Sequence, residues 1–166
     1  MKILVFSDSH NHPDLMEKAI RLNLDHGLDA VFFLGDGYPD FERLAAKYPG
    51  PLYLGVLGNC DGYRLLEGGT YEKLAELGGR RFLLIHGHRF GVKRSIGGAV
   101  DYAAAKGADV LLYGHTHEAF DETLDASDGT SVRVINPGSA GDWFSASFAL
   151  LELLPDGQVL CSFGGK

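Results

Sequence analysis

The sequence has few cysteines and no long apolar runs. Only Cys60 and Cys161 are present among 166 residues. A disulfide framework would need more, so we expect both to be free thiols in a reducing cytoplasm. The first apolar run, Ile3 to Phe6, is too short for a signal peptide and far too short to cross a bilayer. The sequence therefore predicts a cytoplasmic protein with no membrane partner.

The chain also has fewer positively charged residues than negatively charged ones. Fifteen Lys and Arg against 22 Asp and Glu give a formal net charge of −7. General binders of nucleic acid or anionic membranes carry basic patches, so we expect no stable nucleic-acid partner. A small anionic substrate remains compatible with this charge, because bound cations can dominate the local charge of a site. The length favours a single domain over residues 1–166, and assembly into a homo-oligomer is left open.

Several well-known enzyme motifs are missing from the sequence. It contains no Walker A, GxGxxG, HExxH or GxSxG pattern. Nucleotide-loop, dinucleotide, zincin and serine-hydrolase functions therefore have no support. Glycine, by contrast, is abundant: 23 residues cluster at the ends of predicted strands, where tight turns are needed.

Hydrophobic periodicity predicts alternating strands and helices in the first two thirds of the chain. The predicted strands are 2–6, 30–34, 52–57, 71–77, 81–85 and 110–113, and predicted helices begin at Pro13, Phe41 and Ile96. The first helix places Leu15, Ala19, Ile20 and Leu22 on one stripe. Four predicted antiparallel strands follow, at 119–124, 131–135, 147–154 and 158–163. This order predicts an α/β protein with a two-sheet core and helices outside.

A metal-type ligand follows each of five predicted strands, at intervals of 28, 23, 27 and 29 residues. These intervals are close to the length of a strand–helix–strand unit. The five motifs are Asp8-Ser9-His10, Gly35-Asp36, Gly58-Asn59, His86-Gly87-His88 and Gly114-His115-Thr116-His117. Strands joined in this way run parallel, so we expect their carboxyl ends to share one edge, where ligand crevices lie. Each motif alone also fits an ordinary turn or a surface histidine. Their consistent placement after strands predicts one shared site.

The residue types of these motifs indicate a metal centre. In an extended chain residues i and i+2 point the same way, so Asp8 and His10 can face one ion. Nitrogen and oxygen ligands without sulfur suit Mn²⁺, Fe, Ni²⁺ or Zn²⁺. The candidate ligands are Asp8, His10, Asp36, Asn59, His86, His115 and His117. Seven ligands exceed the needs of one tetrahedral ion, which favours two ions sharing a carboxylate.

Together these motifs resemble the signature of the calcineurin-like metallophosphoesterases. The small size and Gly58-Asn59-Cys60-Asp61 resemble the compact bacterial and archaeal phosphodiesterase branch, as does Asn136-Pro137-Gly138-Ser139. The resemblance covers nearly the whole chain and implies a four-layer αββα sandwich, with two mixed sheets flanked by helices. It also implies two divalent ions, with Mn²⁺ favoured. One ion would take Asp8, His10, Asp36 and His117, and the other Asp36, Asn59, His86 and His115.

The expected reaction is hydrolysis of a small phosphodiester. Two divalent ions bring a charge of +4, Asp8 and Asp36 supply −2, and a bridging hydroxide leaves about +1, which attracts a diester. The hydroxide is expected to attack phosphorus in line while the cations stabilise the equatorial oxygens. Two alternatives stay open. One is a phosphomonoesterase, which would want further fixed positive groups. The other is a non-catalytic interaction scaffold, since the same fold serves as a subunit of a eukaryotic membrane-coat complex.

Asn59, Cys60 and His88 are the predicted catalytic residues. In many relatives the position of Cys60 holds a histidine that helps to protonate the leaving group. A thiolate nucleophile would need a nearby base or a depressed pKa, so Cys60 either packs as a small apolar residue or lines the pocket. His88 either lies near the site or faces solvent. The basic residues considered for gripping phosphate are Arg64, Lys93 and Arg94.

Overall fold

The computed structural model describes residues 1–165, with every side chain except those of residues 65–67. Its first half contains β1 (Lys2–Phe6), α1 (Asp14–Leu24), β2 (Leu28–Phe33), α2 (Tyr38–Lys47), β3 (Leu52–Gly55) and the 3₁₀ helix η1 (Asn59–Glu67). The second half contains β4 (Glu72–Leu77), β5 (Arg80–Ile85), the 3₁₀ helix η2 (His88–Phe90), α3 (Gly97–Ala105), β6 (Val110–Leu112), β7 (Ala119–Asp125), β8 (Ser131–Pro137), β9 (Ser147–Leu153) and β10 (Val159–Gly165).

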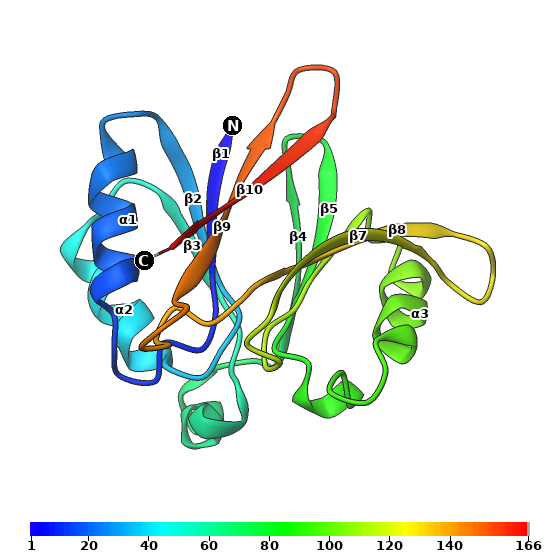
Figure 1. Cartoon of the computed structure of the whole chain (residues 1–166), viewed down its shortest axis with the longest axis horizontal. Helices are drawn as coiled ribbons and strands as arrows, with labels where there is room; N and C mark the ends of the chain where they lie inside the picture. Colours follow the sequence, from blue (N-terminus) through cyan, green and yellow to red (C-terminus); the bar gives the residue numbers. More distant parts are fainter. Residues whose placement is uncertain (166) are drawn as a thin grey trace.

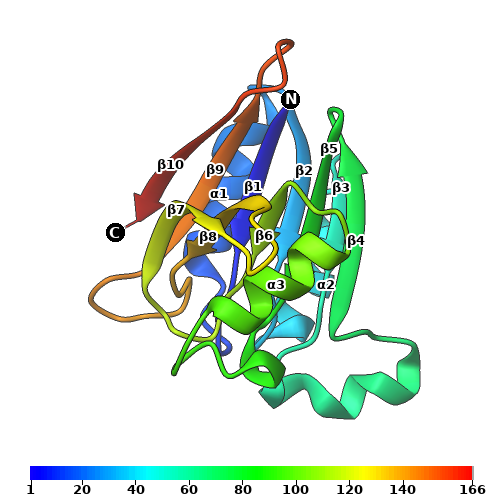
Figure 2. The ribbon, with the colours of Figure 1, turned by 90° about the vertical axis from the view of Figure 1, so that its right-hand side faces the viewer.

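Two five-stranded mixed sheets lie at the centre of the molecule. Their strand orders are β10-β9-β1-β2-β3 and β4-β5-β6-β8-β7. Helices α1 and α2 cover the outer face of the first sheet, and α3 covers the outer face of the second (Figure 1). Figure 2 looks onto the second sheet from the side that α3 covers, with α3 in front. The prediction of a four-layer αββα sandwich is confirmed.

The central strands are apolar on both faces because both faces are covered. On β1, Ile3 and Val5 pack between the two sheets, whereas Leu4 and Phe6 pack beneath α1 and α2. This explains the unbroken apolar run that opens the sequence. A third apolar cluster fills the space between the second sheet and α3.

Some predicted details are wrong. Leu22 was predicted to lie in the buried stripe of α1, but it is 57% exposed. Met16 is buried in that stripe instead. Leu22 lies two residues beyond the buried Ile20, about 200° around the helix axis, and so it faces solvent. Helix α2 begins at Tyr38, earlier than predicted, because Pro39 sits in its first turn, where no backbone N–H is needed.

The strand pairing also differs from the sequence-based expectation. The hairpin across Gly78-Gly79 is confirmed as antiparallel β4–β5. Of the last four strands, β7–β8 and β9–β10 are antiparallel pairs, but β8 runs parallel to β6 and β9 joins the other sheet beside β1.

The strands that carry candidate ligands do not share one sheet edge. Strands β1, β2 and β3 run parallel in the first sheet, and β5 and β6 run parallel in the second. The loops after all five strands gather at the lower end of the sandwich in Figure 1. The candidate site therefore spans both sheets at one end of the molecule.

Both cysteines are free thiols, as expected. Cys60 is exposed, and Cys161 is half-buried in β10. Among the helices described within residues 1–165, none is long and apolar enough to cross a membrane.

Candidate metal centre

Most of the candidate ligands have unusual backbone conformations. The described non-glycine residues with positive φ are Asp8 (54°), His10 (46°), Asn11 (66°), Asp36 (59°), His115 (70°) and His117 (65°). All but Asn11 are predicted metal ligands. A left-handed backbone conformation costs a non-glycine residue about 1–3 kcal/mol, and residues in this conformation tend to cluster at functional sites. The loops therefore turn sharply at the strand ends in a way that projects ligand side chains.

Two of the glycines that precede candidate ligands are required by close packing. A Cβ added to Gly58 would lie 2.0 Å from Oδ1 of Asp36. A Cβ added to Gly114 would lie 1.9 Å from Oγ of Ser7 and 2.9 Å from Oδ2 of Asp8. The Gly-Asn and Gly-His pairs of the sequence thus let the loops approach the carboxylates of neighbouring loops.

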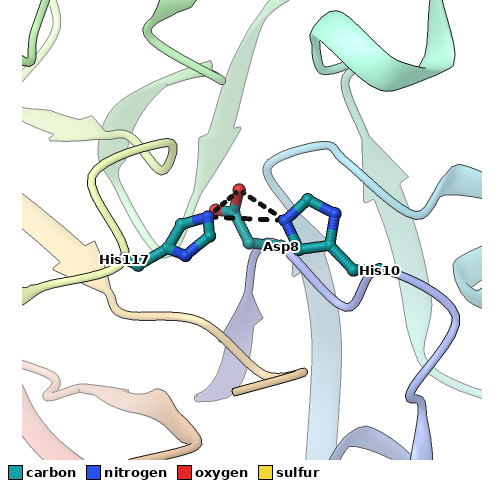
Figure 3. Close-up of side chains that lie close together, drawn as sticks. All are labelled: Asp8, His10 and His117. Carbon is teal, nitrogen blue, oxygen red and sulfur yellow. Dashed lines mark hydrogen bonds and ion pairs between the residues drawn. The ribbon is translucent and has the colours of Figure 1, made fainter.

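One cluster of ligand atoms is formed by Asp8, His10 and His117, whose side chains point toward one another in Figure 3. Nε2 of His117 lies 3.1 Å from Oδ1 of Asp8 and 3.4 Å from Nε2 of His10. Nε2 of His10 lies 3.7 Å from the same oxygen of Asp8. Asp8 is fully buried, while the two imidazoles are partly open to solvent. This cluster corresponds to most of the first predicted ion site.

A second cluster is formed by Asp36, His86 and His115. Nε2 of His86 lies 3.5 Å from Oδ2 of Asp36 and 3.2 Å from Oδ1 of Asn59. Nδ1 of His86 donates a hydrogen bond of 2.7 Å to the carbonyl oxygen of Leu34. Because a carbonyl can only accept, this bond leaves Nε2 to face the site, as a metal-binding histidine requires.

The two clusters adjoin each other. Nε2 of His86 in the second cluster is 4.0 Å from Oδ1 of Asp8 in the first. Asp36 also groups with His10 and Cys60, so its carboxylate lies between the clusters. This position fits the predicted role of Asp36 as a ligand shared by two ions, which stays a prediction.

The electrostatics keep both carboxylates ionised. Burial alone would raise the pKa of Asp8, but hydrogen bonding from His117 and the charge of His86 lower it overall. For Asp36 burial is again outweighed, here by hydrogen bonds from His86 and the Cys60 amide, and its pKa lies far below the ordinary value. The fully buried Asp8 and the mostly buried Asp36 therefore offer fixed negative charge to a cation.

Cys60 lines the site rather than packing in the core. Its amide donates to Oδ1 of Asp36 at 2.8 Å, and its Sγ lies 3.3 Å from Oδ2 of the same residue. Nδ2 of Asn59 lies 3.4 Å from the sulfur. Burial of the thiol and its contact with the Asp36 carboxylate raise the pKa of Cys60 to about 11. The structure thus decides between the two locations left open by the sequence, and the catalytic role stays a prediction.

His88 lies beside the second cluster. Its ring centroid is 5.3 Å from that of His86 and 6.2 Å from that of His115. Nδ1 of His88 is buried without a hydrogen-bond partner. The ring also lines a cavity of about 240 Å³, together with Tyr71 and Tyr102. Burial and the charge of His86 lower the pKa of His88.

Of the basic residues considered for phosphate, Lys93 carries a positive charge that opposes protonation of His115 and His117. Burial is the main cause that lowers the pKa of His115, whereas the hydrogen bond to Asp8 raises the pKa of His117 overall. Arg64 forms an ion pair of 2.9 Å with Glu42. Neither observation assigns a phosphate contact.

Three supporting residues, Asp61, Asn136 and Ser139, were not predicted as part of the site. The Asp61 carboxylate is 2% exposed and accepts backbone hydrogen bonds from the loops after β2 and β3. Its donors are Asp36 (2.7 Å), Gly37 (3.1 Å), Tyr38 (3.0 Å) and Gly58 (2.9 Å). The sequence signal for Asp61 was its place two residues after the candidate ligand Asn59, but an acidic residue in a loop is too common to be singled out.

Asn136 supports the loop that carries His115 and His117. Its Nδ2 donates to the carbonyl of Gly114 at 3.2 Å and to Oγ1 of Thr116 at 3.0 Å. Oγ of Ser139 donates to the carbonyl of Asp8 at 2.9 Å. The Asn136-Pro137-Gly138-Ser139 stretch therefore braces two ligand loops, a role that its sequence match alone did not reveal.

The donor set fits divalent metal ions. The two clusters present imidazole nitrogens and carboxylate oxygens, and the amide oxygen of Asn59 lies beside the second. Metal-binding histidines typically have their second nitrogen bonded to a carbonyl or carboxylate, which is the arrangement of His86. The site can hold cations with ligands of the type that suits Mn²⁺, Fe, Ni²⁺ or Zn²⁺.

Comparison with known proteins agrees with this geometry. Residues 1–155 match the model of the calcineurin-like phosphoesterase superfamily domain. The chain is 32% identical to phosphodiesterase MJ0936 of Methanocaldococcus jannaschii over 155 residues, covering 83% of each protein. The structure of a novel archaeal phosphodiesterase is similar, with a TM-score of 0.71 and 25% identity over 99% of this chain and all of that one.

The same fold occurs in a more distant protein. Vps29 of Entamoeba histolytica, solved in complex with Zn²⁺, has a TM-score of 0.68 and 23% identity over 99% of both chains. At this identity the likeness concerns the fold alone.

Proposed function

The chain belongs to the calcineurin-like phosphoesterase superfamily, and on that premise we propose that it is a metal-dependent phosphodiesterase acting on a small phosphodiester. The observation that carries the proposal is the pair of adjoining clusters, Asp8–His10–His117 and Asp36–His86–His115. They offer the ligands that two divalent ions need, and the relative MJ0936 bears the name phosphodiesterase. We take Mn²⁺ as the first metal to test and the cytoplasm as the compartment, because both cysteines are free thiols.

In this proposal, ions bound at the clusters would offset the charge of the phosphoryl oxygens and make hydroxide available near neutral pH by lowering the pKa of water. The protein fixes the geometry of that chemistry. Asp8 and Asp36 supply negative charge, His86 is oriented by its bond to Leu34, and Asn59 completes the second cluster. The roles of His88 and Cys60 as proton donors to the leaving group remain for experiment.

A phosphomonoesterase is the second candidate, favoured by one observation. A monoester dianion wants additional positive charge, and Lys93 acts electrostatically on both His115 and His117. A non-catalytic scaffold has less support, because the candidate ligands converge and five of them hold left-handed backbone, which scaffolding alone would not require.

The test is a panel of phosphate esters assayed with several divalent metals. The phosphodiesterase proposal expects hydrolysis of bis(4-nitrophenyl) phosphate that exceeds hydrolysis of 4-nitrophenyl phosphate. It also expects activity to disappear with a chelator and return with added Mn²⁺. Preference for the monoester would favour the second candidate. Stoichiometric metal binding without hydrolysis of any ester would favour the scaffold.

A further inference from the structure

Two aromatic side chains stand in solvent on the loop between β8 and β9. Trp143 is 72% exposed and Phe144 is 97% exposed. Trp143 is the only tryptophan of the chain. Single exposed apolar residues are ordinary, but two large aromatic side chains exposed at consecutive positions can offer binding energy to a flat partner.

The loop that carries these rings is tied to the first cluster. The amide of Gly141 donates to the carbonyl of Asp8 at 3.1 Å, and the amide of Ala140 donates to the carbonyl of Ser7 at 2.8 Å. A Cβ on Gly141 would lie 2.1 Å from the carbonyl oxygen of Ser9. The aromatic loop is therefore packed directly against the backbone of the ligand loop.

The Trp143 ring contacts a histidine that follows the ligand loop of that cluster. It meets the ring of His12 edge-on, with centroids 5.0 Å apart and an angle of 64° between planes. His12 is two residues beyond His10, whose side chain is 38% exposed. In the same cluster, the side chain of His117 is 40% exposed. The aromatic loop thus lies against the segment from Ser7 to His12, which carries the ligands Asp8 and His10.

The loop is held in one conformation before any ligand arrives. Oδ1 of Asp142 accepts hydrogen bonds from the amides of Phe144 and Ser145, both at 2.8 Å, and from Oγ of Ser145 at 3.1 Å. A surface ordered in advance loses little conformational entropy on binding.

We propose that Trp143 and Phe144 form a stacking platform for an aromatic ring of the substrate, so that the preferred phosphodiesters carry a nucleobase or another flat aryl group. The inference rests on the proposed function, because phosphate held at the clusters is what brings the ring to the loop. Every base has a flat face, so the platform selects aromatic over aliphatic groups with little preference among bases.

The position and size of the surface favour a small ligand over a macromolecule. The net charge of −7 disfavours a nucleic-acid polymer. A stable protein interface covers about 800 Å² on each partner, which is much more than two side chains provide. A ring attached to a phosphate at the Asp8–His10–His117 cluster needs only to reach the neighbouring loop that carries Trp143 and Phe144.

The binding test uses the single tryptophan as its reporter. The Mn²⁺-loaded protein is titrated with AMP and, separately, with ribose 5-phosphate, while Trp143 emission is recorded. Stacking is expected to quench the emission with AMP, and ribose 5-phosphate, which has the same phosphate and sugar, is expected to leave it unchanged. No turnover is needed. A protein that quenches with AMP but hydrolyses no diester would overturn the proposed function while retaining the platform.

Calorimetry of three variants then separates stacking from a structural role. Trp143→Leu is expected to weaken AMP binding roughly tenfold, with a smaller loss for Phe144→Leu, since base–aromatic stacking of this kind has about that effect. Ribose 5-phosphate should bind all variants equally. Phe163→Leu, an exposed aromatic on β10, is the matched control and should bind both ligands as the unmodified protein does.

Two results would overturn the platform. One is equal affinity of AMP for the unmodified protein and Trp143→Leu. The other is a change of oligomeric state in Trp143→Leu, by sedimentation, with unchanged AMP affinity, which would identify the surface as a contact between copies of the chain.

Discussion

The carboxylate of Asp61 accepts a hydrogen bond of 2.7 Å from the backbone amide of Asp36. Asp36 is the residue whose side chain lies between the two ligand clusters. The Asp61 carboxylate also binds the amides of Gly37, Tyr38 and Gly58. A single buried side chain therefore joins the loops after β2 and β3 and fixes the direction in which Asp36 points. Replacing a residue that positions metal ligands in this way typically lowers metal affinity about 10- to 100-fold.

Replacing Asp61 by Asn is expected to weaken metal binding and to destabilise the protein. The amide has one acceptor oxygen for four backbone donors, so some buried N–H groups lose their partner at a cost of about 2 kcal/mol. Calorimetric metal titration and thermal unfolding measure the two effects. Asp109→Asn is the control, since Asp109 also accepts a backbone amide, from Arg81, but is exposed. Equal effects of the two substitutions would contradict the positioning role.

Asp36→Asn is expected to remove the charge that two ions would share in the proposed site. Metal stoichiometry should fall below two per chain, and diester hydrolysis should drop roughly 10²-fold or more, as happens when charge-stabilising groups are removed. Metal analysis and steady-state kinetics test both. Asp29→Asn is the control, because Asp29 accepts the amide of Lys2 on an exposed surface. Near-normal turnover with two bound ions would show that Asp36 is not the bridge.

Asn59→Ala is expected to weaken one ion selectively. Oδ1 of Asn59 faces Nε2 of His86 in the second cluster, and Asn59 belongs to the second predicted ion site. A metal titration should therefore show one step of unchanged affinity and one step weakened about 10-fold or more. Uniform loss at both steps would contradict the assignment of Asn59 to one ion.

The pKa shifts predict how the stability of the metal-free protein depends on pH. Asp8 and Asp36 have pKa values below the ordinary 3.8, so their contribution to stability is present above that value and is lost as pH falls through the lowered pKa values. His86 and His117 have pKa values above the ordinary 6.5, so their contribution is complete below 6.5 and is lost as pH rises through the raised values. His88 and His115 have pKa values below 6.5 and act in the opposite sense, so the contributions of the four histidines partly cancel near that pH. The melting temperature of the metal-free protein should therefore fall most clearly as pH drops below about 4, where Asp8 and Asp36 take up protons.

Metal binding should strengthen with pH. The ions displace protons from His86 and His117, so affinity should increase by up to about tenfold per pH unit for each proton released. Calorimetric titrations from pH 6 to pH 8, in buffers of different ionisation enthalpy, count these protons. Metal affinity that does not change over this range would show that neither histidine is a ligand.

The sequence predicted the parts of the fold and site that depend on local pattern. The apolar run of β1 and the Gly78-Gly79 hairpin follow from periodicity and turn chemistry. The division of the ligand strands between two sheets does not, because strand spacing is the same whether or not neighbouring strands pair. The candidate ligands could be found because they follow strands. Asp61 could not, because its importance comes from hydrogen bonds to residues far away in the chain.

The chemical properties of Cys60 also could not be predicted from the sequence alone. Its place beside Asn59 was visible, but its contact with Asp36 and the resulting rise of its pKa to about 11 require the fold. At neutral pH the metal-free thiol is therefore almost fully protonated, and it is a poor proton donor compared with an imidazolium. We expect the protein to favour leaving groups that depart without a proton, such as nitrophenolate, over simple alkoxides.

Substitutions at Cys60 test this expectation. Cys60→Ser and Cys60→Ala should retain both ions and much of the activity toward activated diesters, because no bond to the thiol is needed for an easily departing group. Cys60→His should extend activity toward poorer leaving groups if the ring fits beside Asp36. The measurement is the rate against leaving-group pKa for each variant, with Cys161→Ala as the control at the other free thiol. If Cys60→Ala abolishes hydrolysis of the activated diester while both ions and the fold remain, the thiol takes part in the chemistry directly.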